Sequence, residues 1–169
     1  MFFLNNFRAL SSITVLVSIL LLAAAYYFEY VVGLEPCPMC MMQRIVVFVL
    51  GWIALVAAIH NPDKPFGRKV YASTAGLVSI AGIAIAIRHS WIQAFPPEDL
   101  PDCGAPLDYM LDILPFQETL TYMLTGSASC TDVSWHFIGL TMPNWMILVF
   151  IGYGIYSMLL VKAANQTNV

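Results

Sequence analysis

Four long apolar runs without charged residues alternate with shorter polar stretches along the chain. They occupy Ala9–Phe28, Ile45–His60, Val70–Ile87 and Asn144–Val161. About 20 apolar residues, at about 1.5 Å each, cross a hydrocarbon layer of roughly 30 Å as a helix. Two runs are slightly short, but amphipathic residues suited to the membrane interface flank them, namely Arg88, Trp91 and Trp145. The pattern predicts an all-α bundle of four transmembrane helices at about 9–28, 42–60, 70–88 and 144–162, with loops at about 29–41 and 89–143.

The long loop carries helical periodicity of its own. Apolar residues recur at helical spacing at Leu107, Met110, Leu111 and Leu114. An amphipathic segment of this kind lies flat on a membrane surface. A second short apolar set follows Pro115, formed by Leu120, Met123 and Leu124. We therefore expect the loop to carry a short membrane-surface helix and to stay close to the bilayer.

Helix-breaking residues mark the turns between the predicted spans. The cluster Asn61-Pro62-Asp63-Lys64-Pro65 ends the second helix, and Pro36 and Pro38 keep the first loop extended until that helix starts. No repeat or low-complexity tract divides the chain. Residues 1–169 are therefore predicted to form a single membrane domain.

The composition excludes a water-soluble domain. Of the 169 residues, 60% are hydrophobic and only 10% are charged, and the mean hydropathy is +0.78. A soluble domain needs a solvated polar surface, which this composition cannot supply. The chain is therefore predicted to be an integral membrane protein.

The distribution of positive charge predicts the orientation in the membrane. Five basic residues fall on one side if the four spans alternate: Arg8, Lys64, Arg68, Lys69 and Lys162. Positive residues in short loops mark the cytoplasmic face. Between Arg88 and Lys162 there is no Lys or Arg at all. We expect both termini in the cytoplasm and both loops, 29–41 and 89–143, on the outer side.

A cleaved secretory signal is the alternative for the first run, because Ala23-Ala24-Ala25 resembles a cleavage site. The apolar stretch of a signal spans roughly 7–15 residues after a clearly positive start. This run is longer, and only Arg8 precedes it. We therefore expect it to remain as a span.

Four cysteines fall in the loops predicted to face outward. Cys37 and Cys40 form a Cys-x-x-Cys pair at the entrance to the second span, and Cys103 and Cys130 lie in the long loop. In an oxidising compartment an even number of cysteines normally pairs. For Cys103 and Cys130 a structural bridge and a reactive one are both open, since such a bridge stabilises by roughly 4 kcal/mol in the chain-entropy model.

The close pair favours chemistry over stability. A bridge across two intervening residues removes little chain entropy, so its structural value is small. A dithiol at the edge of the membrane is placed to pass electrons from a soluble protein to an acceptor dissolved in lipid. With a second pair in the long loop, the sequence predicts a two-step thiol relay.

The surroundings of Cys40 favour a thiolate. Cys40 falls in the first turn of the second helix, where free N–H groups and the helix dipole favour an anion. Arg44 lies on the same helical face, one turn deeper. A cation at that depth is costly without a task or partner, and the alternative is a side chain that only snorkels to the headgroups.

His89 is the candidate histidine. It lies at the outer end of the third span beside Arg88, so both are predicted to point toward the same interfacial pocket as Arg44. A histidine there is suited to donate a proton or hydrogen bond to a quinone oxygen, the alternative being an interfacial histidine without a role. Three tryptophans are predicted to form an aromatic belt at the outer surface: Trp91, Trp135 and Trp145.

A metal or haem site is disfavoured. A closed zinc site usually draws ligands from two close pairs or a Cys/His set, and the sequence has only one close pair. Attachment of c-type haem needs a histidine directly after Cys40, where the chain has Met41. We expect no metal.

These motifs together resemble the DsbB family of disulfide bond formation proteins, which are quinone reductases of bacterial envelope membranes. The resemblance covers nearly the whole chain. It is carried by the run 35–44 (EPCPMCMMQR), by His89 ahead of Pro96-Pro97 and Cys103, by Ser129-Cys130, and by the run 135–145 (WHFIGLTMPNW).

The resemblance implies a four-helix bundle in the bacterial inner membrane with a quinone, ubiquinone or menaquinone, at its outer end. A reduced periplasmic DsbA-like thiol oxidase is implied to attack a Cys103–Cys130 bridge and to form a mixed disulfide through Cys103. Cys130 then attacks Cys37. Cys40 is left as a thiolate beside the quinone.

The family also implies roles for two other residues. Arg44 stabilises negative charge on the sulfur and on the quinone ring, and His89 matches the family histidine near the quinone by its place before the loop cysteine. Gln43, where an acidic residue would neutralise Arg44, is predicted to leave the guanidinium less neutralised.

Three other functions are open from sequence. A vitamin K epoxide reductase-like protein has two cysteine pairs, but its loop pair precedes the Cys-x-x-Cys, the opposite order to this chain. A paralogue that serves a different soluble oxidant fits equally well. A non-catalytic membrane scaffold with a structural loop disulfide belongs to a different class, and trapping a mixed disulfide would separate it.

Overall fold

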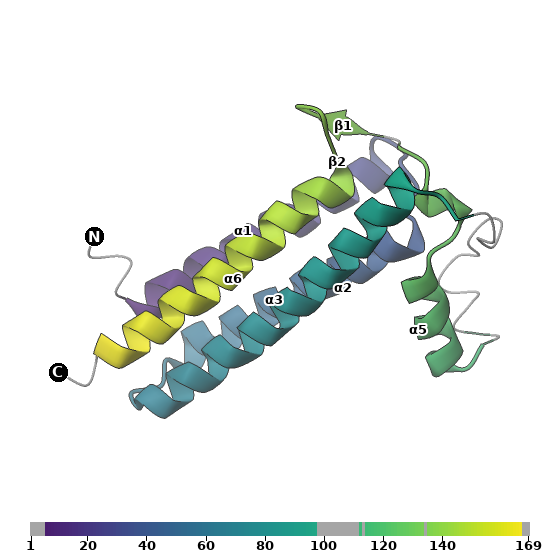
Figure 1. Cartoon of the computed structure of the whole chain (residues 1–169). Coiled ribbons are helices and arrows are strands. Elements are labelled where there is room, and N and C mark those ends of the chain that lie inside the picture. The colour runs from purple at the N-terminus through teal and green to yellow at the C-terminus, as the bar shows by residue number, and fades with distance from the viewer. Residues whose placement is uncertain (1–5, 98–111, 113, 134, 167–169) are drawn as a thin grey trace.

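Four long helices form the body of the computed structural model, which describes residues 6–97, 112, 114–133 and 135–166. They are α1 (Phe7–Tyr30), α2 (Pro38–His60), α3 (Pro65–Ala94) and α6 (Met142–Gln166). Each is long and apolar enough to cross a membrane. The helices alternate in direction, so that α1 begins and α6 ends at the same end of the bundle (Figure 1). The predicted all-α fold with four spans is confirmed.

The helices extend beyond the apolar runs because local capping sets their ends. Cys37 is the extended N-cap of α2 and Pro38 its first residue, and α2 stops where Asn61 adopts a left-handed φ of 36° before Pro62. The predicted breaker cluster therefore forms the turn between α2 and α3. The 30 residues of α3 span about 45 Å, more than the hydrocarbon thickness. Apolarity marks only the part of a helix within lipid, so it underestimates helix length.

Small residues hold the helices together at their closest approaches. Five alanines of the core cluster are almost fully buried, at 0–1% exposure: Ala54, Ala57, Ala72, Ala75 and Ala86. A Cβ atom on Gly82 would lie 2.7 Å from the Phe150 ring, and one on Gly51 would lie 2.8 Å from the Cβ atom of Ser18. Close backbone approach of this kind drives helix association in membranes, where lipid is as apolar as the core.

Buried hydroxyl groups in this core all have partners. Ser18 pairs with the Tyr153 hydroxyl at 2.6 Å, and Ser79 donates to the Phe150 carbonyl at 2.6 Å. An unpaired polar group in hydrocarbon would cost several kcal/mol. The core polar groups are thus structural.

The segment between α3 and α6 contributes smaller elements. These are α5 (Phe116–Thr125), the 3₁₀ turn η2 (Ala128–Cys130), and the strands β1 (His136–Phe137) and β2 (Leu140–Thr141). The apolar set after Pro115 lies in α5, a helix that the sequence did not predict there. The predicted surface helix at Leu107–Leu114 lies almost entirely outside the described residues.

The antiparallel β1–β2 hairpin was not predicted. His136 pairs with Thr141, and Phe137 with Leu140. Both turn residues, Ile138 and Gly139, have positive φ, which two-residue hairpin loops require to match the twist of their strands. A non-glycine residue at the first turn position hid this signal.

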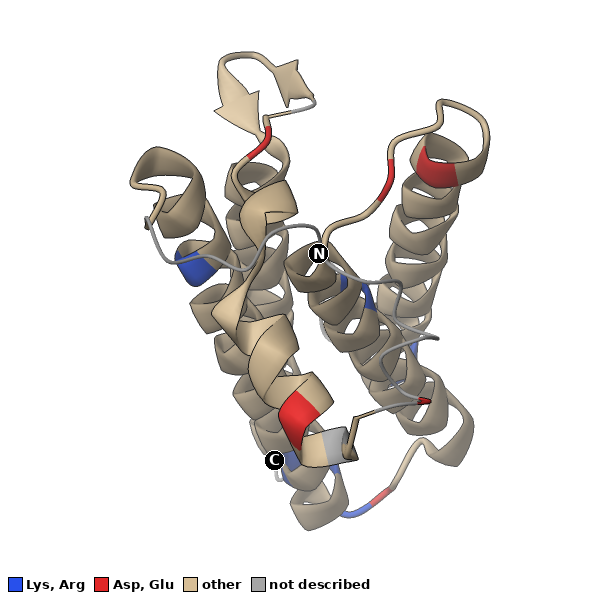
Figure 2. Ribbon diagram, turned by 90° about the vertical axis from the view of Figure 1, so that its right-hand side faces the viewer, with Lys and Arg blue, Asp and Glu red and all other residues tan. Residues whose placement is uncertain are grey.

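Charged residues are sparse along the helical body (Figure 2). The five basic residues used to predict orientation fall at the start of α1, around the α2–α3 turn and near the end of α6. They therefore lie at one end of the bundle, and the start of α2 with its cysteines lies at the other.

Candidate functional site

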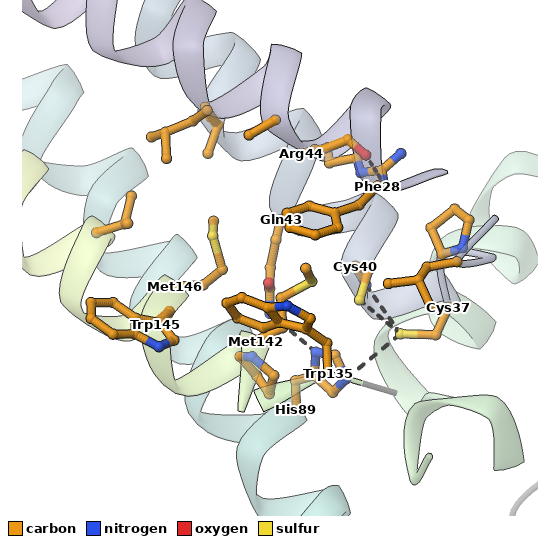
Figure 3. Close-up of a pocket in the computed structure, with 18 of the residues that line it drawn as sticks. Phe28, Cys37, Cys40, Gln43, Arg44, His89, Trp135, Met142, Trp145 and Met146 are labelled. Carbon is orange, nitrogen blue, oxygen red and sulfur yellow. Dashed lines mark hydrogen bonds between the residues drawn. The ribbon is translucent and has the colours of Figure 1, made fainter. Parts of the chain in front are cut away.

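A cavity of about 290 Å³ opens beside the start of α2. All four long helices contribute side chains to it (Figure 3). Its apolar wall includes Leu21, Leu22, Val47, Met146 and Val149. Its polar lining includes Cys37, Cys40, Gln43, Arg44 and His89. Nearly all the candidate residues of the second and third spans therefore meet in one pocket.

The first cysteine pair is arranged by the start of α2. The backbone N–H of Cys40 donates to the Cys37 sulfur at 3.4 Å, so the Cys37 side chain caps the helix. The Cys37 thiol donates to the Cys40 sulfur, with the two Sγ atoms 3.2 Å apart. Cys37 is buried and Cys40 half-buried. The sulfur that accepts, Cys40, is the one in the first helical turn, as predicted.

A glycine turn brings Cys130 to this pair. Gly126 ends α5 with a φ of +86°, a conformation that favours glycine. A Cβ atom there would lie 3.1 Å from Ile92, 3.4 Å from the Met39 sulfur and 3.8 Å from the Cys130 sulfur. The turn η2 then places Cys130, 1% exposed, against Met39 and Ile92.

Cys37 is the sulfur that reaches both others. The Sγ atoms of Cys37 and Cys130 and a ring nitrogen of His89 all lie within 4.8 Å of one another. Cys37, Cys40 and Cys130 are all free thiols in the described part of the chain. Cys103 lies outside the described residues, so its predicted role stays a prediction.

Thiol chemistry differs between these sulfurs. The hydrogen bond to Cys130 lowers the pKa of Cys37, but hydrogen bonding to Cys40 and burial raise it by more, to about 12 from 9.0. Hydrogen bonding to Cys37, together with burial, raises the pKa of Cys130 above its ordinary value. In the reduced protein both sulfurs therefore keep their protons at neutral pH, while Cys40 accepts a hydrogen bond from Cys37.

Arg44 has a partner that sequence reasoning missed. Its guanidinium forms an ion pair with Glu29 near the end of α1, donates to the Ala25 carbonyl at 3.2 Å and lies over the Tyr26 ring. The expectation that Gln43 leaves Arg44 poorly neutralised was wrong, because the carboxylate comes from the preceding helix. The sequence did contain a signal for this pair, because Glu29 lies at the end of the first span and a short loop separates it from the helix of Arg44.

Gln43 instead serves His89. The Gln43 amide nitrogen lies 3.3 Å from His89 Nδ1, and His89 Nε2 lies 3.6 Å from the Cys37 sulfur. Both side chains are buried, at 3% and 2% exposure. His89 lines the same cavity as Arg44, as predicted, but its Nε2 faces a sulfur (Figure 3).

Arg88 does not share this pocket, contrary to prediction. It is exposed, and its guanidinium donates to the carbonyls of Leu124 and Thr125, at 2.6 and 3.4 Å. A cation at a helix C-terminus is favourable, so Arg88 holds the end of α5. Residues adjacent in a helix point about 100° apart, and only His89 faces inward.

Further lining residues come from the end of α3, from the segment before α6 and from the first turn of α6. Trp135 and Trp145, predicted as belt residues, line the cavity, while Trp91 is exposed. Gln93 also lines it, and its buried Oε1 has no hydrogen-bond partner among the described residues. No periodicity marks Trp135 and Trp145 as pocket residues, because the return of the chain from the long loop places them.

Comparison with known proteins identifies the relatives of this fold. The family model described as disulfide bond formation protein DsbB matches residues 7–160. Disulfide bond formation protein B of Stutzerimonas stutzeri is 49% identical over 88% of this chain and 90% of its own. Its namesake in Nitrosococcus oceani is 45% identical over 82% of each chain, and that of Acinetobacter baumannii 38% over 86% and 85%.

Proposed function

This chain belongs to the DsbB family of disulfide bond formation proteins, and we propose that it reoxidises a periplasmic DsbA-like thiol oxidase and passes the electrons to a membrane quinone. Membership makes it a disulfide-forming oxidoreductase of multi-pass membrane type. The proposal adds the electron donor, the acceptor and the bacterial inner membrane with the cysteines on its periplasmic side.

One observation carries the proposal: Cys37 contacts the Cys40 sulfur and lies within reach of the Cys130 sulfur, at the wall of a cavity with an apolar side. Disulfide exchange needs a thiolate to attack one sulfur of a bridge while the other leaves. Cys37 is placed to be attacked from one side and to release Cys40 on the other.

The thiol steps balance on the chain's own residues. The partner thiolate attacks Cys103 of a Cys103–Cys130 bridge, and the bonding pair leaves on Cys130. Cys130 attacks Cys37 of the Cys37–Cys40 bridge, and the pair leaves on Cys40. The two electrons then sit on Cys40, which lines the cavity.

Three features of the chain support Cys40 as the exit point. Its place in the first turn of α2 exposes it to the positive end of the helix dipole. The Cys37 thiol donates a hydrogen bond to it. Arg44, one turn away, lines the same cavity and adds positive charge near the sulfur. Negative charge on Cys40 is thus stabilised.

The cavity fits a quinone. Aromatic side chains offer contact for a flat ring, and an apolar wall suits an isoprenoid tail. Arg44 carries donors for a carbonyl oxygen, His89 lines the same cavity, and the orphan Gln93 Oε1 is an acceptor for a ring hydroxyl. Bound there, a quinone supplies the stronger two-electron oxidant that DsbA-type proteins, near −120 mV, require.

Trapping the first exchange tests the thiol half of the proposal. A reduced DsbA-like partner that keeps only its attacking cysteine is mixed with the oxidised full-length chain. We expect a mixed disulfide at Cys103 and, by peptide mapping, a new Cys37–Cys130 bridge. In Cys37→Ala the mixed disulfide should form without that bridge, and Cys103→Ala should form none. A non-catalytic scaffold would form no mixed disulfide in any variant.

The quinone half has a separate spectroscopic test. Quinone-loaded protein, treated with the same partner, should develop an absorption band from charge transfer between a thiolate and the ring. The band should be absent in Cys40→Ser. It should be present in the parent chain that carries the partner as a mixed disulfide on Cys103. An unchanged band in Cys40→Ser would show that Cys40 is not the thiolate that passes electrons to the quinone.

A further inference from the structure

Three soft donor atoms meet in the reduced site from three separate parts of the chain. Cys37 precedes α2, His89 lies in α3 and Cys130 ends η2, yet their donor atoms lie within 4.8 Å of one another and all three are buried. We propose that the fully reduced protein binds one thiophilic divalent cation, with Zn²⁺ as the reference ion, at these three residues. The site shares sulfurs with the proposed relay, but binding requires neither partner nor quinone.

The spacing suits a tetrahedral ion. Zn–S bonds of about 2.3 Å and Zn–N bonds of about 2.0–2.1 Å place a sulfur and a nitrogen ligand about 3.6 Å apart in a tetrahedron. His89 Nε2 and the Cys37 sulfur are 3.6 Å apart. Two sulfurs stand about 3.8 Å apart in the same geometry, within the 4.8 Å limit that Cys37 and Cys130 satisfy. Small side-chain rotations complete three corners.

Cys40 is outside this donor set. Its sulfur is 3.2 Å from Cys37, closer than two thiolates on one tetrahedral ion, and it does not belong to the group of mutually close donors among the described residues. The fourth corner is thus left to water. Three protein ligands and an open position resemble a reactive metal site more than a closed structural one.

Gln43 supplies the support that a histidine ligand needs. A metal-bound histidine normally donates its other N–H to a neighbouring acceptor, which fixes the ring. The Gln43 amide already contacts His89 Nδ1. Turning that amide about its last bond presents Oε1 to an Nδ1–H, which frees the Nε2 lone pair that faces Cys37.

The charge balance also favours the ion. Two thiols lose their protons on binding, so Zn²⁺ with two thiolates and a neutral imidazole has no net charge. Arg44, which lines the same cavity, is already paired with Glu29. A neutral complex avoids most of the cost of burying charge in this apolar setting.

Binding and disulfide exchange exclude each other. A sulfur in a disulfide has no thiolate to offer, so the oxidised chain lacks two of the three ligands. A bound ion in turn occupies Cys37 and Cys130, the two sulfurs that the second exchange joins. Thiophilic cations are therefore expected to hold the protein in its reduced form.

Cobalt provides the test, because Co²⁺ occupies zinc sites and its thiolate charge-transfer and ligand-field bands report the ligands directly. Quinone-free, fully reduced protein in detergent is titrated with Co²⁺, and Zn²⁺ is then added to displace it. We expect one Co²⁺ per chain with tetrahedral bands, displaced by Zn²⁺. Oxidised protein should show no band.

Variants identify the ligands. Cys130→Ser and His89→Ala should lose the tetrahedral bands, and Gln43→Leu should weaken binding about 10-fold or more. Cys40→Ser and the control His136→Gln, at the exposed β1 strand, should bind like the parent chain. The proposal would be overturned if Cys40→Ser lost Co²⁺ binding while Cys130→Ser kept it. It would also be overturned if the oxidised protein bound Co²⁺ equally well, or if the folded, reduced chain bound none. Circular dichroism verifies folding of each variant.

Discussion

The two halves of the bundle bury polar groups for opposite purposes. The packed interior away from the cavity forms the tight half, where Ser18, Ser79 and Ser157 each bond a neighbouring helix at 2.6–2.8 Å. Toward the start of α2, Arg44 and His89 bond side chains of other segments and also line a cavity. Burial of a polar group therefore does not indicate function in itself. Convergence of several such groups on one space does.

The packing of the two halves differs in the same way. In the tight half, glycines at 51, 76 and 82 let helices approach so closely that an added Cβ would meet a side chain at 2.7–2.8 Å. In the open half, bulky residues such as Trp135 and Trp145 stand around a space. Changes in the tight half should affect stability, and changes in the open half should affect reactivity.

The largest effect is expected from Arg44→Ala in the open half. Loss of a hydrogen bond to a charged group costs about 1.5–3 kcal/mol, so the quinone concentration for half-maximal activity should rise about 10- to 100-fold. Mixed-disulfide formation with the partner should be unchanged. Arg88→Ala, which touches only the end of α5, is the matched control. Equal activity of Arg44→Ala at limiting quinone would remove Arg44 from the mechanism.

Cys37 of the reduced protein should react more slowly than an ordinary thiol. Its pKa of about 12 against 9.0 leaves less thiolate, and the greater nucleophilicity of the more basic sulfur offsets roughly half of that loss. Reaction with a disulfide reagent at pH 7–8 should be about 30- to 60-fold slower than for a thiol of pKa 9.0. Because the pKa of Cys37 is raised, its thiolate fraction, and with it the reaction rate, should still increase between pH 9 and pH 11. Peptide mapping that shows a plateau by pH 10 would contradict it.

In the tight half, Gly82→Val should destabilise the bundle. The new side chain meets the Phe150 ring, and overpacking of this kind costs about 1–3 kcal/mol. Gly152→Val is the matched control on α6, since nothing lies within 4 Å of a Cβ there. Unfolding in detergent measures both. Equal stability of the two variants would mean that the helices separate more easily than their contacts imply.

The smallest effect is expected from Ser18→Ala, which removes the hydrogen bond to Tyr153. Hydrogen bonds between membrane helices contribute about 0.6 kcal/mol on average. Ser12→Ala, exposed on the same helix, should leave stability unchanged. If Ser18→Ala kept its full stability but lost disulfide exchange, residues of the tight half would affect reactivity, contrary to the distinction between the two halves.

The tight half was largely predictable from sequence. Apolar run length predicts the four spans, and the breaker cluster at 61–65 predicts the turn, because both depend on residues close in the chain. Cys40 in the first turn of α2 follows from Pro38 in the same way. Only the helix ends were missed, since capping residues rather than apolarity determine them.

The open half was predictable mainly in its residue types. Cys37, Arg44 and His89 carry recognisable chemistry, but their partners Glu29 and Gln43 depend on which faces the helices turn toward each other. No local pattern encodes that choice. The apolar set after Pro115 predicts that the loop, and Cys130 with it, stays near the first pair, and the sulfur atoms of Cys37 and Cys130 do lie within 4.8 Å of each other. The exact contact depends on the glycine turn at Gly126, which residue spacing does not reveal.

The turn at Gly126 helps to place Cys130 beside Cys37. Its φ of +86° favours glycine, and an added Cβ would lie 3.1 Å from Ile92 and 3.4 Å from the Met39 sulfur, so these side chains would have to shift by a few tenths of an ångström. An alanine there would be strained at this φ, and relief of that strain would change the position of Cys130 relative to Cys37. The position of a reactive sulfur in this site thus depends on a residue that carries no side chain.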